Sequence, residues 1–176
     1  MVINKKGDLL KSEDCTAIVH QVNILGIQGG GIAKQIKARW YKEEYEPYRR
    51  LCLDSVNTTN LLGTIQILPT NEKPIEYIIN LFSELAFGRN EIPLPHGRHT
   101  DYDLLRECLN KVKKWCYDKE IFNIGMPKDL GCGIAGGDWD GVVYPMIQEI
   151  FGDDEKITLN IYEFYVNPFA EVVKTK

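Results

Sequence analysis

The chain has 176 residues, of which 44% are apolar and 26% are charged, and its formal net charge is −4. These values are typical of a folded protein, and they exclude a disordered, collagen-like or coiled-coil chain. The length predicts one domain over residues 1–176. The acidic charge argues against general nucleic-acid binding, since no broad basic surface is available for a phosphate backbone.

Membrane, redox and metal signals are weak. No apolar run approaches the roughly 20 residues that span a bilayer, and residues 1–6 do not begin a signal peptide. We therefore expect a cytoplasmic protein with no membrane partner. The five cysteines form no C-x-x-C pair, which favours a reducing compartment. His96-x-x-His99 has a ligand-like spacing but no second pair nearby, so we expect no metal and no other cofactor.

Short apolar and β-branched runs alternate with helical patterns along the chain. Strands are predicted at residues 2–4, 16–22, 64–68, 75–82, 121–126 and 157–164. Helices are predicted at residues 31–40, 42–52, 100–116 and 145–151, the third of them beginning at a capping box, Thr100-x-x-Asp103. Cys108 and Cys116 fall on the apolar stripe of that helix. The alternation predicts an α/β sandwich with a largely parallel sheet, and a ligand beyond the carboxyl ends of its strands.

A first glycine loop, Gly26-Ile27-Gln28-Gly29-Gly30-Gly31, follows the second predicted strand and opens a helix. Successive glycines let the backbone approach a ligand closely, and the free N–H groups of a helix start bind anions. A flexible surface turn is the alternative.

A second glycine loop, Gly131-Cys132-Gly133-Ile134-Ala135-Gly136-Gly137, precedes Asp138, a candidate helix N-cap. It contains G-x-G-x-x-G, but the dinucleotide-binding motif follows the first strand of a βαβ unit. Here Pro127-Lys128-Asp129-Leu130 separates the loop from its strand, and only one further strand remains. We therefore expect a second phosphate-binding loop at the same sheet edge as the first.

Polar residues gather near these loops. His20 and Asn23 close an apolar strand at the edge that faces the ligand, which favours a functional role for the pair. The alternatives are that His20 supports the loop from below and that Asn23 bonds its own turn. His96 and His99 lie in an irregular stretch, residues 89–100, which is either a lid or an ordinary exposed loop.

Four elements together resemble a macro domain, the ADP-ribose-binding module. They are Gly7-Asp8-Leu9-Leu10, the strand Ile18-Val19-His20-Gln21-Val22-Asn23, the loop Gly29-Gly30-Gly31-Ile32-Ala33, and the loop from Gly131 to Gly137 with Asp138-Trp139. Their order and spacing are those of the family. The resemblance implies a three-layer α/β/α sandwich with a mixed, largely parallel central sheet.

Within the family the chain is similar to the branch of yeast-type ADP-ribose 1″-phosphate phosphatases, terminal ADP-ribose glutamate hydrolases, and phage or bacterial relatives. His20, Leu81-Phe82-Ser83 with Phe87-Gly88, and His96-Gly97 resemble the phosphatase members. The glutamate hydrolases carry a lysine nucleophile on the strand that here reads Ile78-Ile79-Asn80-Leu81, and an Asp where Ala135 stands. Both departures argue against lysine-dependent removal of ADP-ribose.

The resemblance also implies roles for single residues. Asp8, beside Leu9, would accept a hydrogen bond from the adenine amino group, while Phe164 or Tyr162 would pack on the ring. Asn23 and the first loop, Gly29, Gly30, Gly31 and Ile32, would hold the distal ribose. The second loop would wrap the pyrophosphate with Gly131, Cys132, Gly133, Ile134, Ala135, Gly136 and Gly137.

The expected activity is hydrolysis of ADP-ribose 1″-phosphate to ADP-ribose and phosphate. In that reaction His20 would move a proton, Asn23 would fix the ribose, and Asp138 would orient a water. The alternatives are an ADP-ribosyl hydrolase that acts on modified macromolecules and a non-catalytic reader of ADP-ribose. The expected partner is accordingly ADP-ribose, ADP-ribose 1″-phosphate or an ADP-ribosylated macromolecule.

Overall fold

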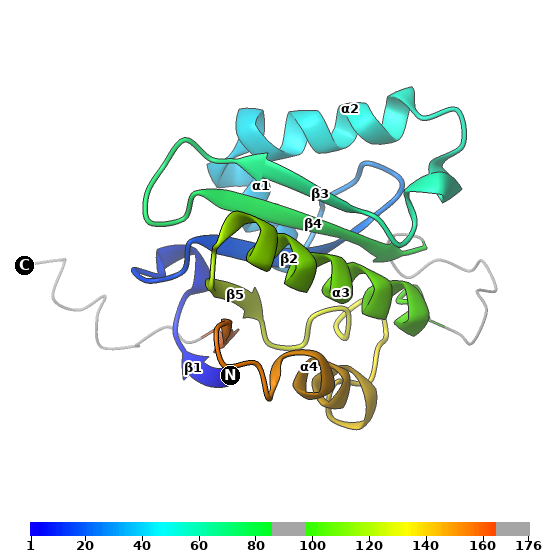
Figure 1. The fold of residues 1–176 in the computed structure, drawn as a ribbon. Helices are drawn as coiled ribbons and strands as arrows, with labels where there is room; N and C mark the ends of the chain where they lie inside the picture. The colour runs from blue at the N-terminus through cyan, green and yellow to red at the C-terminus, as the bar shows by residue number, and fades with distance from the viewer. Residues whose placement is uncertain (86–97, 165–176) are drawn as a thin grey trace, which may run out of the picture.

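A six-stranded sheet forms the centre of the computed structural model, which describes residues 1–85 and 98–164 (Figure 1). The strand order is β1-β6-β5-β2-β4-β3. All neighbouring strands are parallel except β3, which pairs antiparallel with β4. The strands are β1 (Val2–Lys6), β2 (Ala17–Asn23), β3 (Ile65–Pro69), β4 (Tyr77–Glu84), β5 (Asn123–Pro127) and β6 (Thr158–Glu163).

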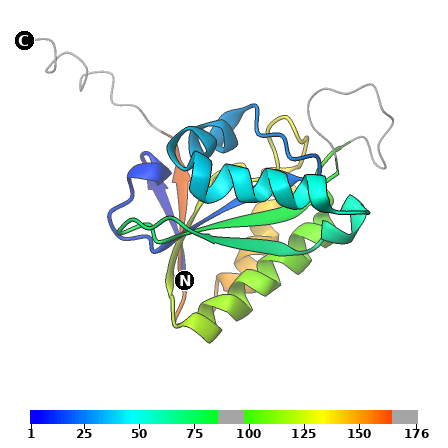
Figure 2. The same ribbon diagram turned by 90° about the horizontal axis from the view of Figure 1, so that it is seen from above.

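Helices cover both faces of the sheet (Figures 1 and 2). One face carries α1 (Gly31–Arg39), the π-helical turn η2 (Tyr41–Tyr45) and α2 (Glu46–Asp54), and the other carries α3 (Tyr102–Lys119) and α4 (Tyr144–Phe151). The shorter helical turns are η1 (Leu9–Lys11), η3 (Thr58–Leu61) and η5 (Trp139–Val143). The predicted α/β/α sandwich with a mixed, largely parallel sheet is confirmed.

The core follows the two-residue period of the strands. In β2, Ala17 and Val19 pack toward α3 and α4, whereas Ile18 and Val22 pack toward the layer of α1, η2 and α2. Because both faces of β2 are covered, its residues are buried almost without interruption, as a central parallel strand requires. Cys108 and Cys116 lie in the core as expected, and all five cysteines are free.

Two details of the helices differ from the sequence-based prediction. The N-cap of α3 is Asp101, whose carboxylate accepts a hydrogen bond from Leu104 N at 3.0 Å. Thr100, expected in a capping box, instead donates from its hydroxyl to the carbonyl of Gly131. The helix predicted at residues 42–52 is divided into η2 and α2, with Pro47 in the first turn of α2. Proline has no N–H to donate, so it suits that position.

Within the described ranges, no helix is both long and apolar enough to cross a membrane.

Candidate functional site

A cavity of about 490 Å³ lies at the edge of the sheet where the parallel strands end. Its volume is in the range of small-molecule sites. Residues at or just after the carboxyl ends of five strands line it: Gly7 after β1, Tyr162 on β6, Pro127 on β5, Asn23 on β2 and Glu84 on β4. The cavity therefore lies where a ligand is expected in an open parallel sheet.

The first glycine loop forms one wall of the cavity. Gly29, Gly30, Gly31 and Ile32 line it, and α1 begins at Gly31 with Gly30 as its N-cap. The first N–H groups of a helix have no acceptor within the helix, so this wall offers donors to an anion.

The second glycine loop forms the facing wall. Gly131, Gly133, Ile134 and Ala135 line the cavity. A Cβ atom built on Gly30 would lie 3.6 Å from Ile134 Cδ1, so the loops approach each other across the opening. Figure 2 shows them on the same side of the sheet. The predicted placement of both loops at one sheet edge is confirmed.

Three residues of the second loop, Cys132, Gly136 and Gly137, do not line the cavity. Gly137 closes the loop on itself, since its N–H donates to the carbonyl of Gly131 at 3.0 Å. A Cβ atom on Gly137 would lie only 2.6 Å from that oxygen, whereas one on Gly133 would meet nothing within 4 Å. Gly137 is thus required by the shape of the loop.

We predict that Gly137→Ala lowers the free energy of unfolding by about 2 kcal/mol, because the loop must open to admit the methyl group. Gly133→Ala is the matched control and should leave stability nearly unchanged. Urea unfolding of the two variants tests the difference. Equal stabilities would show that the second glycine loop admits a methyl group at Gly137 without strain.

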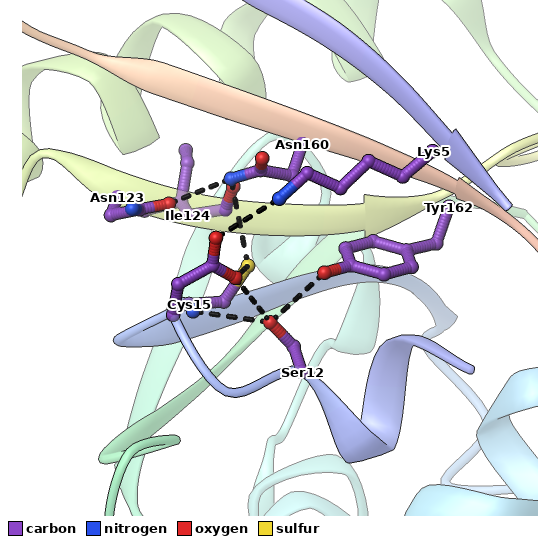
Figure 3. A network of polar contacts seen from close by, with 8 residues as sticks. Lys5, Ser12, Cys15, Asn123, Ile124, Asn160 and Tyr162 are labelled. Atoms are coloured by element: carbon purple, nitrogen blue, oxygen red, sulfur yellow. Dashed lines mark hydrogen bonds and ion pairs between the residues drawn. The ribbon is translucent and has the colours of Figure 1, made fainter. Parts of the chain in front are cut away.

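Aromatic residues line one end of the cavity, near β1 and β6. The hydroxyl of Tyr162 donates to Ser12 Oγ at 3.1 Å, and Ser12 Oγ donates to Asp14 Oδ1 at 2.9 Å (Figure 3). Asp14 in turn pairs with Lys5 at 3.0 Å. This network fixes the Tyr162 ring. Phe164 also lines the cavity, so both aromatic residues for which the resemblance implied contact with adenine line it.

The segment after β1 contributes Leu9 to the same end of the cavity, while Asp8 does not line it. The Asp8 carboxylate accepts a hydrogen bond from Leu10 N at 3.0 Å and so caps η1.

The structure does not bring His20 to the cavity. Its side chain is fully buried, with Nε2 2.6 Å from Asn80 Oδ1 and 3.7 Å from Glu44 Oε1. Strand alternation directs His20, like Ile18 and Val22, toward the layer of α1, η2 and α2. The expectation that His20 reaches a substrate is therefore wrong, and its place in the interior matches the alternative of a supporting role.

The buried carboxylate of Glu44 connects this interior cluster to the cavity wall. Glu44 Oε1 accepts hydrogen bonds from Gln28 Nε2 at 2.6 Å and from Asn80 Nδ2 at 3.0 Å. Gln28 lines the cavity, and its buried Oε1 has no partner among the residues that the structure describes. Glu44 thus holds the residue that precedes Gly29.

We predict that Glu44→Ala lowers the free energy of unfolding by about 3 kcal/mol, because it leaves the buried Gln28 amide without its acceptor, removes one of the two acceptors of Asn80 Nδ2 and empties a buried site. Glu44→Gln keeps Oε1 and should lose much less. Chemical denaturation at neutral pH measures both values. A loss for Glu44→Ala no larger than that for Glu44→Gln would mean that the cluster adds nothing to stability.

Asn23 lines the cavity, but its amide bonds the turn that follows. Nδ2 donates to Ile27 O at 2.8 Å, and Oδ1 accepts from Leu25 N at 3.0 Å and from Tyr48 Oη at 2.9 Å. The alternative of a turn-forming residue is therefore observed. A role for Asn23 in fixing ribose stays a prediction.

The remaining predicted residues lie away from the cavity or outside the described residues. Asp138 is exposed and caps η5 by accepting from Gly141 N at 2.9 Å, as its N-cap prediction required. It does not line the cavity, and neither does His99, which is buried. His96 falls outside the described residues, so the proposed lid of His96 and His99 stays a prediction.

Sequence reasoning missed Glu84, the last residue of β4. Glu84 lines the cavity, and burial raises the pKa of its carboxyl to about 7. The sequence does contain a signal for Glu84, because it is a charged residue at the end of an apolar strand, at the edge that faces the ligand. The same pattern favoured His20 and Asn23.

Cations are scarce at the site. Among the described residues that line the cavity, Lys128 is the only cation, and it pairs with Glu163 at 3.6 Å. In the same part of the chain, no group of three or more His, Cys, Asp or Glu side chains is placed to hold a metal ion. A bound anion would therefore depend mainly on backbone N–H groups.

The model of the Macro domain family matches residues 19–146. The chain belongs to this family. It is 30% identical over 143 residues to proteins named DNA ADP-ribosyl glycohydrolase from Mycobacterium tuberculosis and Mycobacterium bovis, a match that covers 81% of this chain and 36% of each relative. The chain thus spans about a third of the length of these relatives.

Solved macro domain structures resemble the fold. The macrodomain of Thermus aquaticus DarG has a TM-score of 0.72 and 25% identity, covering 93% of this chain and 98% of that one. Thermosipho africanus DarTG in complex with ADP-ribose has a TM-score of 0.69 and 16% identity, covering 97% of this chain and 44% of the other. The second likeness concerns the fold alone.

Proposed function

We propose that this macro domain binds ADP-ribose along the cavity and hydrolyses the bond that joins its distal ribose to a nucleic acid. One observation carries the proposal. One cavity runs along the ends of the parallel strands. It is lined by aromatic residues near β1 and β6, then by both glycine loops near β5 and β2, and then by Glu84 on β4. That order of groups corresponds to the order of groups in ADP-ribose.

The strand order orients the ligand. β1 and β6 lie at one end of the row of parallel strands and contribute Leu9, Tyr162 and Phe164, which suit the flat apolar faces of adenine. The glycine loops beside β5 and β2 offer backbone donors to the pyrophosphate. The distal ribose would then lie near Asn23 on β2 and Glu84 on β4.

The relatives named DNA ADP-ribosyl glycohydrolase support a hydrolase that acts on modified nucleic acid. An acidic chain does not contradict this substrate. The cavity would recognise one ADP-ribose group, and a single group does not require the basic surface that binding to a nucleic-acid backbone requires.

A second candidate is hydrolysis of ADP-ribose 1″-phosphate, which the resemblance of Leu81-Phe82-Ser83 to phosphatase members favours. Its substrate would occupy the same cavity, with the phosphate at the distal ribose. His20 was expected to move a proton in this reaction. Its side chain lies in the interior, so the phosphatase reaction would need another group for that step.

We predict that Gly30→Glu abolishes ADP-ribose binding. The backbone at Gly30 is extended (φ −148°), so a side chain causes no strain. That side chain would enter the space between the loops, and its carboxylate would repel the pyrophosphate, so the affinity should fall by more than about 100-fold. Calorimetric titration measures the loss, and Gly30→Ala is the matched control because its Cβ would make only an ordinary 3.6 Å contact. Equal affinity in all three proteins would place the ligand elsewhere.

We predict turnover of a DNA oligonucleotide that carries one ADP-ribose, with release of free ADP-ribose and unmodified DNA. ADP-ribose 1″-phosphate, assayed alongside for released phosphate, tests the second candidate. Gly30→Glu should be inactive on every substrate that the wild type hydrolyses. Tight binding of ADP-ribose without turnover of either compound would instead identify a reader.

A further inference from the structure

Glu84 is held at the cavity by an irregularity in the sheet. β2 and β4 pair in register up to Val22 and Phe82, and the register then shifts so that Asn23 pairs with Glu84, passing over Ser83. Such bulges redirect side chains and are frequent beside active sites. Here the shift sets Glu84 next to Asn23, and both line the cavity.

The backbone around Glu84 is fixed from the other side as well. Glu84 forms an antiparallel bridge with Thr100, Leu85 N donates to His99 O at 2.8 Å, and Asp101 N donates to Ser83 O at 3.0 Å. Thr100 also holds the second glycine loop through Gly131. The position of the Glu84 backbone is thus coupled to the wall that would bind the pyrophosphate.

The Glu84 carboxylate differs from the other acidic groups near the site. Asp8 caps a helical turn, Glu44 accepts hydrogen bonds from two side-chain amides, and Glu163 pairs with Lys128. Asp129 also lines the cavity, but it is exposed to solvent, whereas Glu84 is partly buried. Glu84 has no hydrogen bond or ion pair from its side chain to any residue within 1–85 and 98–164. Because burial disfavours the charged form, the pKa of Glu84 rises to about 7.

We propose that Glu84 is the general base of the hydrolysis, taking a proton from the water that attacks C1″ of the distal ribose. This inference rests on the proposed function. The water oxygen forms a bond to C1″ as the bond from C1″ to the leaving group breaks, and the leaving group keeps the electron pair. The leaving group takes a proton from solvent, and Glu84 returns its own proton to solvent. The products are ADP-ribose and the unmodified macromolecule.

Glu84 suits this role because a base is most effective when its pKa lies near the working pH. The buried titratable side chains on the elements packed around it are Tyr48 and Cys52 on α2, Glu44 and Tyr45 on η2, His20 on β2, and His99 beside the Thr100 bridge. Burial raises the pKa of Tyr48 far above its usual value and that of Cys52 to about 11, so neither changes charge near neutral pH. The test separates Glu84 from the two histidines, because Glu84→Gln removes the Glu84 carboxyl and leaves both imidazoles in place.

The test measures kcat from pH 5 to 9 on the ADP-ribosylated oligonucleotide for wild type, Glu84→Gln and Glu84→Asp. Wild-type kcat should rise with pH about a midpoint near 7, because the ionised carboxylate is the active form. Glu84→Gln should lower kcat by about 100-fold or more and remove this rise, while the Kd of ADP-ribose stays within about threefold. Glu84→Asp keeps a carboxylate and should restore part of the activity. Glu155→Gln, an exposed carboxylate replaced in the same way, is the matched control.

A readout without substrate accompanies the kinetics. A carboxyl whose pKa is raised by folding destabilises the protein as pH rises from the unfolded pKa through the folded one. Glu84→Gln should therefore melt at a higher temperature than wild type at pH 8, and at about the same temperature at pH 5.

The outcomes are distinct. Wild-type turnover with a full kcat in Glu84→Gln, or a pH rise that persists in that variant, overturns the assignment of Glu84 and leaves the proposed function standing. No wild-type turnover, with ADP-ribose still bound, contradicts the proposed hydrolysis and the base together. The assignment is supported if Glu84→Gln lowers kcat, removes the rise of kcat with pH, and melts at a higher temperature than wild type at pH 8 but not at pH 5.

Discussion

The site depends on the parallel pairing of five strands, β1, β6, β5, β2 and β4, which brings their carboxyl ends to one edge of the sheet. Segments that are far apart in sequence meet there. The aromatic end of the cavity comes from β1 and β6, the glycine loops follow β2 and β5, and Glu84 ends β4. The strand order then sets their spatial order, so the topology alone lays out an elongated site with chemically different ends.

Two glutamates near the cavity differ in how the protein accommodates their charge. Glu44 is fully buried, yet two amides donate to its carboxylate, and it stabilises the wall near Gln28. Glu84 is partly buried and lacks such partners in the described part of the chain, and burial raises its pKa above the usual value of a carboxyl. Hydrogen bonding makes Glu44 a structural group, whereas Glu84, with no such bond to the described residues, suits the proton transfer that we propose. The backbone N–H groups of the glycine loops supply the positive potential that an anionic ligand needs, without adding cations to an acidic protein.

Much of this architecture could be predicted from local patterns. Alternating strands and helices, and glycines next to a strand end, follow from short-range periodicity and backbone sterics. His20 shows where such reasoning fails. His20 is close to the loop in sequence, which favours a role at the site. Strand alternation instead directs its side chain toward the layer of α1, η2 and α2, where it lies beside Asn80 and Glu44. Glu84 shows the converse, because the register shift beside Ser83 and the burial that raises its pKa are tertiary properties. The capping of α3 by Asp101 rather than Thr100 has the same origin, since Thr100 is engaged by the second glycine loop.

A crystal structure of the complex with ADP-ribose tests the central claim most directly, because that claim concerns the direction in which the ligand lies. The account predicts adenine beside Tyr162 and Phe164, the pyrophosphate between the two glycine loops, and C1″ of the distal ribose within one water molecule of the Glu84 carboxylate. A ligand bound in the opposite direction, or a distal ribose separated from Glu84 by protein, would contradict it.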